Sequence, residues 1–268
     1  MPQDAFIITL PPRQLPALRG WQVIPAHLAY RLGPGPHLFR ADSTIPKSGL
    51  MVIDDRDFDG LGPTGPLCQE VLRECQARSF SGAVLDFDNR LPPLEQIASH
   101  LDEQFARRGW TLYVTGRYAP HAPHARVMIP SALSGGSLRQ RLEEALERFG
   151  ESRVVLALEL RREDFYLPSP TGSGQPLTEQ GLKELMDRLS PSVFFSGDLC
   201  ARYFTYMSRE HGARFVLFDD GDTLQRKVEV ARKLGVHTFL APWAEAAPYA
   251  SQLGIQRRPA PRQGHRHV

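Results

Sequence analysis

The sequence predicts an α/β fold, a (β/α)8 TIM barrel that forms a single domain. Short apolar runs rich in β-branched and aromatic residues recur along the chain, as is typical of strands buried on both faces. Amphipathic stretches with helical spacing separate many of these runs. A length of 268 residues suits one barrel, which needs about 250. The expected strands are 50–53, 83–85, 112–114, 126–129, 154–158, 193–195, 214–218 and 238–240, and the expected helices are 66–78, 93–108, 137–149, 177–189 and 223–234.

The chain divides into three parts by composition. Residues 1–49 are rich in proline and glycine and should contribute one or two strands to the barrel, such as 21–24. Residues 50–250 form the barrel body, and 251–268 read as a flexible basic tail. There are more candidate strands than a barrel needs, so one or two should be hairpins outside it. The Gly/Ser/Pro loop 168–176 is expected to lie over the barrel mouth.

Composition narrows the possible partners and the location. Apolar residues make up 41% of the chain, and a net charge of +2 creates no basic field for nucleic acid. No apolar stretch is long enough to span a membrane, and the run 6–10 is too short for a signal peptide. We therefore expect a cytoplasmic protein whose three cysteines, Cys68, Cys75 and Cys200, are reduced and buried. Nothing in the sequence indicates the oligomeric state.

The sharpest local signal is the segment 81–89, SGAVLDFDN, where an apolar strand ends in two carboxylates. Asp86 and Asp88 are two residues apart, so strand geometry places both on the same face. Catalytic groups of barrels collect at the carboxyl ends of strands, and two close carboxylates separate their pKa values into an acid and a base. Alternatively, these aspartates cap the next helix or pair with a basic residue.

No metal or other cofactor is expected. Asp55, Asp57 and Asp59, followed by a glycine, match the first half of a calcium loop, but Pro66 stands where a bidentate glutamate is required. The histidines lack the spacing of a zinc site. A polar loop at the barrel mouth is the better interpretation of 55–60.

The segment 81–89 resembles the signature strand of family 18 glycoside hydrolases, D-G-x-D-x-D-x-E. It is most similar to the shortened form G-V-N-I-D-F-E-N of bacterial spore-cortex hydrolases in that family. Gly82, Leu85, Asp86, Phe87 and Asn89 fit this form. Aspartate replaces the final glutamate, at Asp88, so the resemblance implies a divergent catalytic motif.

Two later blocks strengthen the resemblance. Residues 203–206, YFTY, precede a turn near 211–212, a strand at 214–218 that ends before Asp219 and Asp220, and Lys227 on the next helix. This order resembles a hairpin of the cortex hydrolases. Residues 235–243, GVHTFLAPW, resemble the last family strand, G-x-x-G-x-x-x-W, whose tryptophan, here Trp243, forms the floor of a sugar subsite.

The resemblance implies recognition of a glycan that contains N-acetylglucosamine, peptidoglycan or chitin-like, and a substrate-assisted reaction. Asp88 would be the acid and Asp86 would orient the acetamido group. Trp243 is expected to bind sugar, with Tyr203, Asp219 and Asp220 as further binding residues. A family tyrosine should end a strand as M-x-Y-D, but the best matching strand ends at 158–161 without it. Glu159, on that strand, is expected to bind substrate or to supply the missing acid.

Three functions remain open at this point. The chain is a slow glycoside hydrolase, an inactive sugar-binding relative, or a structural barrel that binds no glycan. Cell-wall or spore association is compatible with the first two.

Overall fold

The computed structural model describes residues 3–41, 44–168, 174–208 and 212–258. It confirms the predicted barrel. Eight parallel strands close into a cylinder because β1 pairs with both β14 and β2. In barrel order the strands are β1 Ala5–Leu10, β2 Ile24–Gly33, β4 Leu50–Asp54, β5 Gly82–Asp86, β6 Thr111–Thr115, β7 Arg126–Pro130, β8 Val154–Ala157 and β14 Thr238–Pro242.

The barrel wall is buried on both sides, which explains the continuous apolar runs. Side chains that point inward fill the barrel, among them Ile7, Val52, Val84 and Val155. Side chains that point outward pack under the helices in a larger core. Gly82 is required where β5 approaches β6, because a Cβ atom there would lie 2.0 Å from the Thr111 carbonyl oxygen.

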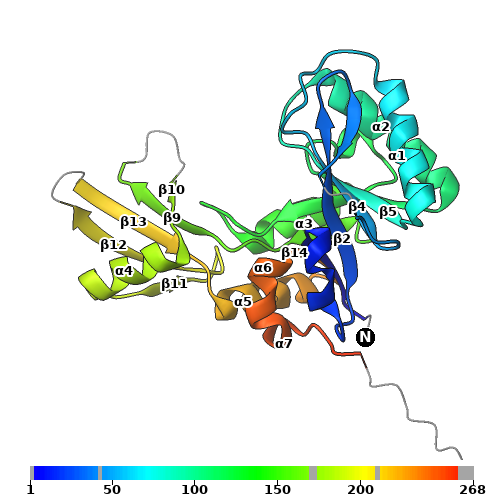
Figure 1. Cartoon of the computed structure of the whole chain (residues 1–268). Helices are drawn as coiled ribbons and strands as arrows, with labels where there is room; N and C mark the ends of the chain where they lie inside the picture. The colour runs from blue at the N-terminus through cyan, green and yellow to red at the C-terminus, as the bar shows by residue number, and fades with distance from the viewer. Residues whose placement is uncertain (1–2, 42–43, 169–173, 209–211, 259–268) are drawn as a thin grey trace, which may run out of the picture.

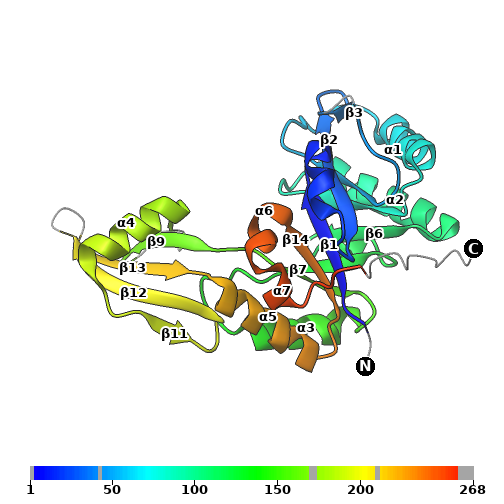
Figure 2. The same cartoon turned by 60° about the horizontal axis from the view of Figure 1, so that its bottom comes forward.

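The outer ring of helices is incomplete. Four long helices lie between barrel strands: α1 Thr64–Arg78, α2 Pro92–Arg108, α3 Leu138–Phe149 and α5 Gly221–Lys233. Short 3-10 turns, η1 Pro12–Leu18 and η2 Ala119–His121, replace helices after β1 and β6, and β3 His37–Arg40 forms a hairpin with β2. Figure 2 shows α3 and α5 side by side beneath the barrel, where they are in contact.

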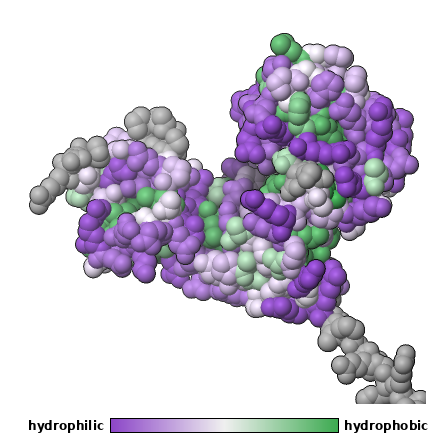
Figure 3. Space-filling view, in the orientation of Figure 1, coloured by the Kyte–Doolittle hydropathy of each residue, from purple (hydrophilic) through white to green (hydrophobic). Residues whose placement is uncertain are grey.

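A second, antiparallel sheet is inserted between β8 and α5. It comprises β9 Arg162–Tyr166, β10 Gln175–Pro176, β11 Phe194–Ser196, β12 Ala201–Ser208 and β13 Gly212–Phe218. Helix α4 Glu179–Leu189 covers one face of this sheet through Leu182 and Leu185. Figure 1 shows the sheet and α4 as a lobe beside the barrel, and Figure 3 shows the surface indented between the two parts.

Several sequence expectations need correction or completion. The surplus strands 193–195 and 214–218 belong to the second sheet, so the body 50–250 is a barrel with an insertion. The strand expected at 21–24 begins only at Ile24, because residues 19–20 form a turn and Trp21 makes only an isolated bridge to Arg257. Within the loop 168–176, residues 169–173 lie outside the described part, as do residues 209–211 of the expected hairpin turn.

The start of the expected tail is packed against the barrel. The elements α6 Trp243–Ala246, η3 Ala247–Tyr249 and α7 Ala250–Leu253 follow β14. Leu253 and Ile255 are buried, and the Arg257 guanidinium lies 3.9 Å from the ring centroid of Trp21. Residues 251–258 are therefore held in place, and residues 259–268 lie outside the described part. Across the described ranges, none of the helices combines the length and hydropathy that a membrane crossing requires.

Candidate functional site

A pocket of about 590 Å³ opens at the carboxyl ends of the barrel strands. Its floor is apolar, because the last inward-pointing residues of the strands form it. Its polar lining comes from residues at or just after the strand ends and from one residue of α3, Arg141. These polar residues are Thr9, Asp86, Asp88, Thr115, Arg117, Arg141 and Glu159.

Asp86 and Asp88 both line this pocket, as the strand spacing predicts. Asp86 is the last residue of β5. Phe87, between them, points the other way into the core and packs edge-on against Tyr118, with ring centroids 5.6 Å apart. Burial by the surrounding protein raises the pKa of Asp86, and the nearby charges of Asp88, Asp54 and Asp55 raise it further.

The loop that carries Asp88 is held from two sides. The buried carboxylate of Asp55, directly after β4, accepts hydrogen bonds from the backbone N–H groups of Asp88 and Asn89, both at 3.0 Å. On the other side, Arg117 donates to the Asp88 carbonyl oxygen and the Tyr118 hydroxyl donates to the Asn89 carbonyl oxygen. This support fixes the position of Asp88 relative to Asp86.

The three aspartates of the calcium-like segment have other partners. Asp55 supports the Asp88 loop, Asp57 pairs with Arg31 at 2.7 Å, and Asp59 accepts from the Leu61 N–H. Among the described residues, no group of three or more His, Cys, Asp or Glu side chains is arranged to hold a metal ion.

Glu159 follows β8 and lines the same pocket. In the barrel, β6 and β7 lie between β5 and β8. The Glu159 backbone N–H donates to the Ser131 hydroxyl at 3.1 Å. Burial raises the pKa of the Glu159 carboxyl, and the charges of Glu245 and Asp86 add to this effect. The pocket therefore contains two carboxyl groups, Asp86 and Glu159, that hold a proton at higher pH than usual.

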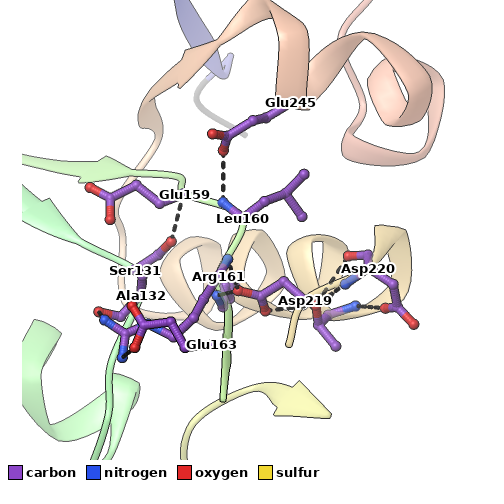
Figure 4. Close-up of polar contacts among 11 residues, drawn as sticks. Ser131, Ala132, Glu159, Leu160, Arg161, Glu163, Asp219, Asp220 and Glu245 are labelled. Atoms are coloured by element: carbon purple, nitrogen blue, oxygen red, sulfur yellow. Dashed lines mark hydrogen bonds and ion pairs between the residues drawn. The ribbon is translucent and has the colours of Figure 1, made fainter. Parts of the chain in front are cut away.

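The backbone beside Glu159 is clamped by side chains from several elements (Figure 4). The Leu160 N–H donates to Glu245 at 2.7 Å, and the Arg161 N–H donates to Asp219 at 2.9 Å. Asp219 is itself buried and forms an ion pair with Lys227 at 2.7 Å. This clamp lies where the chain leaves the barrel for the second sheet, so it fixes Glu159 and the inserted lobe together.

The other predicted binding residues lie elsewhere. Tyr203 is on β12, where its ring packs between Phe194 and Phe215. Asp220 is the N-cap of α5 and pairs with Arg202. These residues, like the buried Asp219, are not among the pocket lining.

Trp243 also lies outside the pocket lining. Its ring meets that of Trp21 edge-on, with centroids 6.1 Å apart, and packs against the main core. The preceding residue, Pro242, lines the pocket instead. Of the seven residues singled out in the sequence, the structure thus brings together Asp86, Asp88 and Glu159.

Sequence reasoning missed Arg117 and Arg141. Arg117 follows the end of β6 by two residues, so the rule that led to Asp86 could have found it. Arg141 lies within α3 and had no such signal. Strand β7 also ends at the pocket, where Met128, Ile129 and Pro130 are part of the lining.

The pocket continues on both sides. A hollow of about 370 Å³ shares Asp86 and Asp88 with it and extends over β2 and β4 to Arg31 and Arg56. A smaller one of about 230 Å³ shares Glu159 and reaches the second sheet. The shared residues join the three hollows into one groove across the barrel mouth.

No protein-family model and no curated protein sequence matches the chain. Its fold, however, matches solved structures. The spore cortex-lytic enzyme SleL of Bacillus cereus is 14% identical, with a TM-score of 0.69 over 94% of this chain and 73% of that one. SleL of Bacillus megaterium gives 0.64 at 14% identity, over 89% and 70% of the two chains. A chitinase from Chromobacterium violaceum gives 0.67 at 14% identity, over 94% and 98%. The chain therefore shares the barrel fold of these spore cortex-lytic enzymes and of this chitinase.

Proposed function

We propose that this pocket binds a glycan that contains N-acetylglucosamine, of the peptidoglycan or chitin type, and hydrolyses it slowly. The observation that carries the proposal is the convergence of Asp86, Asp88 and Glu159 in one pocket at the carboxyl end of a closed barrel. The groove that extends from this pocket suits a polymer. The solved structures with this fold include proteins named as a cortex-lytic enzyme and a chitinase.

The proposed reaction uses the two aspartates of the β5 motif in different roles. Asp88 protonates the glycosidic oxygen while the acetamido oxygen of the substrate attacks the anomeric carbon, so the glycosidic bond breaks and the leaving sugar departs as an alcohol. Water then opens the cyclic intermediate and completes the hydrolysis. Asp86 holds that acetamido group by accepting a hydrogen bond from its N–H, which leaves the acetamido oxygen free to attack. No resident cofactor is needed for these steps.

The reaction is slow because the acid is short. Asp88 lacks one methylene relative to glutamate, which withdraws its carboxyl group by about 1.5 Å. A misplacement of about 1 Å can reduce a catalytic rate by about 100-fold.

The same observation supports a second candidate, glycan binding without cleavage. It is favoured by Asp88 itself and by the strand β7, whose lining residues Met128, Ile129 and Pro130 include neither the tyrosine nor the aspartate of the M-x-Y-D pattern.

Mass spectrometry of digests decides between these functions. The substrates are N-acetylglucosamine oligomers and purified cortex peptidoglycan, and the enzymes are wild type, Asp88→Asn and Asp88→Glu. We expect slow cleavage by wild type, none by Asp88→Asn, and faster cleavage by Asp88→Glu. Cleavage that survives in Asp88→Asn would exclude Asp88 as the acid.

If the wild type cleaves nothing, titration calorimetry with the same oligomers separates the remaining functions. Saturable binding would identify a sugar-binding protein. No binding by the folded protein would refute the proposal and leave a structural barrel.

A further inference from the structure

Two arginines share the pocket with the carboxylates, and neither has a carboxylate partner among the described residues. Arg117 follows β6, and its partners are the neutral carbonyl oxygens of Asp88 and Asn89 and the Tyr118 hydroxyl. Arg141 lies in the second turn of α3 and lines the pocket. Within the described ranges, its side chain makes no hydrogen bond or ion pair. Both positive charges are therefore available to a ligand.

The neighbouring arginine on the same helix behaves differently. Arg139 pairs with Glu143 at 3.2 Å in an ordinary helical ion pair and is not part of the pocket lining. On α3, the arginine that lines the pocket thus lacks an ion-pair partner among the described residues, whereas Arg139, outside the lining, has one.

These arginines are not the main counter-charges of the pocket carboxyl groups. The cation that acts most on the pKa of Asp86 is Arg56, and those that act most on the pKa of Glu159 are Lys227 and Arg161. These charges work to lower the two pKa values, but burial outweighs them and both values are raised. Arg117 and Arg141 are thus not the cations that act on these two carboxyl groups.

An unpartnered hydroxyl lies in the same wall. Thr115 ends β6, and its Oγ1 atom is buried without a hydrogen-bond partner among the described residues. A buried polar atom of this kind costs free energy until a ligand or water pairs with it. Thr115 and Arg117 together offer a hydroxyl and a guanidinium to one ligand group.

From these groups we infer that the pocket selects a glycan with a carboxylate substituent over a neutral one. This inference rests on the proposed glycan binding and names the class of glycan. Guanidinium groups bind carboxylates through paired, charge-assisted hydrogen bonds. A muramic acid residue carries such a carboxylate on its lactyl ether when no stem peptide is attached to it, whereas chitin has none.

The test compares two ligands that differ by one charge. The first is the disaccharide of N-acetylglucosamine and N-acetylmuramic acid with a free lactyl carboxylate, and the second is its methylamide. Titration calorimetry is performed on wild type, Arg141→Gln, Arg117→Gln and the matched control Arg139→Gln. We expect wild type and Arg139→Gln to bind the carboxylate about tenfold more tightly, and Arg141→Gln to lose most of this preference. Thermal unfolding shows that each variant is folded.

Each outcome decides the inference. Preference that disappears in Arg141→Gln and weakens with added salt supports it. Equal binding of the two ligands by wild type overturns it and leaves the proposed function standing. Preference that persists in both Arg141→Gln and Arg117→Gln also overturns it, because other residues then recognise the charge. Failure of wild type to bind either ligand overturns the inference, and failure to bind the N-acetylglucosamine oligomers as well overturns the proposed function.

Discussion

Replacing Asp55 by asparagine should loosen the loop that carries Asp88. Asp55 is fully buried, and its two oxygens accept the N–H groups of Asp88 and Asn89, both at 3.0 Å. Asparagine keeps the shape but presents an NH2 group to one of these donors. One hydrogen bond to a charged acceptor is lost and one buried N–H loses its partner. We therefore expect the free energy of unfolding to fall by about 2–4 kcal/mol.

Urea unfolding followed by tryptophan fluorescence measures this change. The control is Asp59→Asn in the same segment, because Asp59 is exposed and accepts only the Leu61 N–H at 2.9 Å. The control should stay within about 0.5 kcal/mol of wild type. Oligomer binding should weaken in Asp55→Asn and not in the control. A stability for Asp55→Asn equal to that of the control would refute the role of Asp55 as the support of the loop.

Three further predictions concern buried groups. Lys227→Met leaves Asp219 buried without its cation, so the free energy of unfolding measured with urea should fall by about 3–5 kcal/mol. Adding Asp219→Asn to this variant should recover part of the loss. A loss below about 1 kcal/mol in Lys227→Met alone would contradict the pairing. Because the pKa of Glu159 is raised in the folded state, the folded protein holds this proton more tightly than the unfolded chain, so wild type loses stability as the pH rises above the ordinary value of 4.5. Glu159→Gln should therefore have a higher Tm than wild type at pH 7, with the difference vanishing near pH 4; a lower Tm at pH 7 would contradict this. Burial raises the pKa of Cys68 and Cys75 to about 12, so at pH 8 neither thiol should react with Ellman's reagent until the protein unfolds.

The barrel was predictable because its strands are buried on both faces. That burial leaves continuous apolar runs in the sequence, and six of the eight predicted runs became barrel strands. The runs 193–195 and 214–218 look the same locally, yet they pair with β12 and β9 in the second sheet. Pairing depends on partners far away in the chain, which the local pattern of residues does not contain.

The site was partly predictable for a similar reason. Asp86, Asp88 and Glu159 follow barrel strands directly, so the strand pattern alone places them at the mouth. Tyr203 and Asp220 belong to the same motifs, but the insertion carries Tyr203 into another sheet and the start of α5 uses Asp220 as a cap. Motif order along the chain indicated family resemblance better than it indicated which side chains meet.

Local patterns in the chain were enough to predict an α/β barrel, the carboxylate pair after β5 and the buried, unpaired cysteines, because each depends on residues close in sequence. Tertiary structure decided which carboxyl groups share the pocket, how Asp55 supports the Asp88 loop, and that Arg117 and Arg141 face the same space. It also decided the clamp on 159–161. The physical reason is that desolvation, charge pairing and hydrogen bonding depend on which groups surround a residue in space. In a closed barrel those groups come from strands that are far apart in the sequence, as the pairing of β1 with β14 shows.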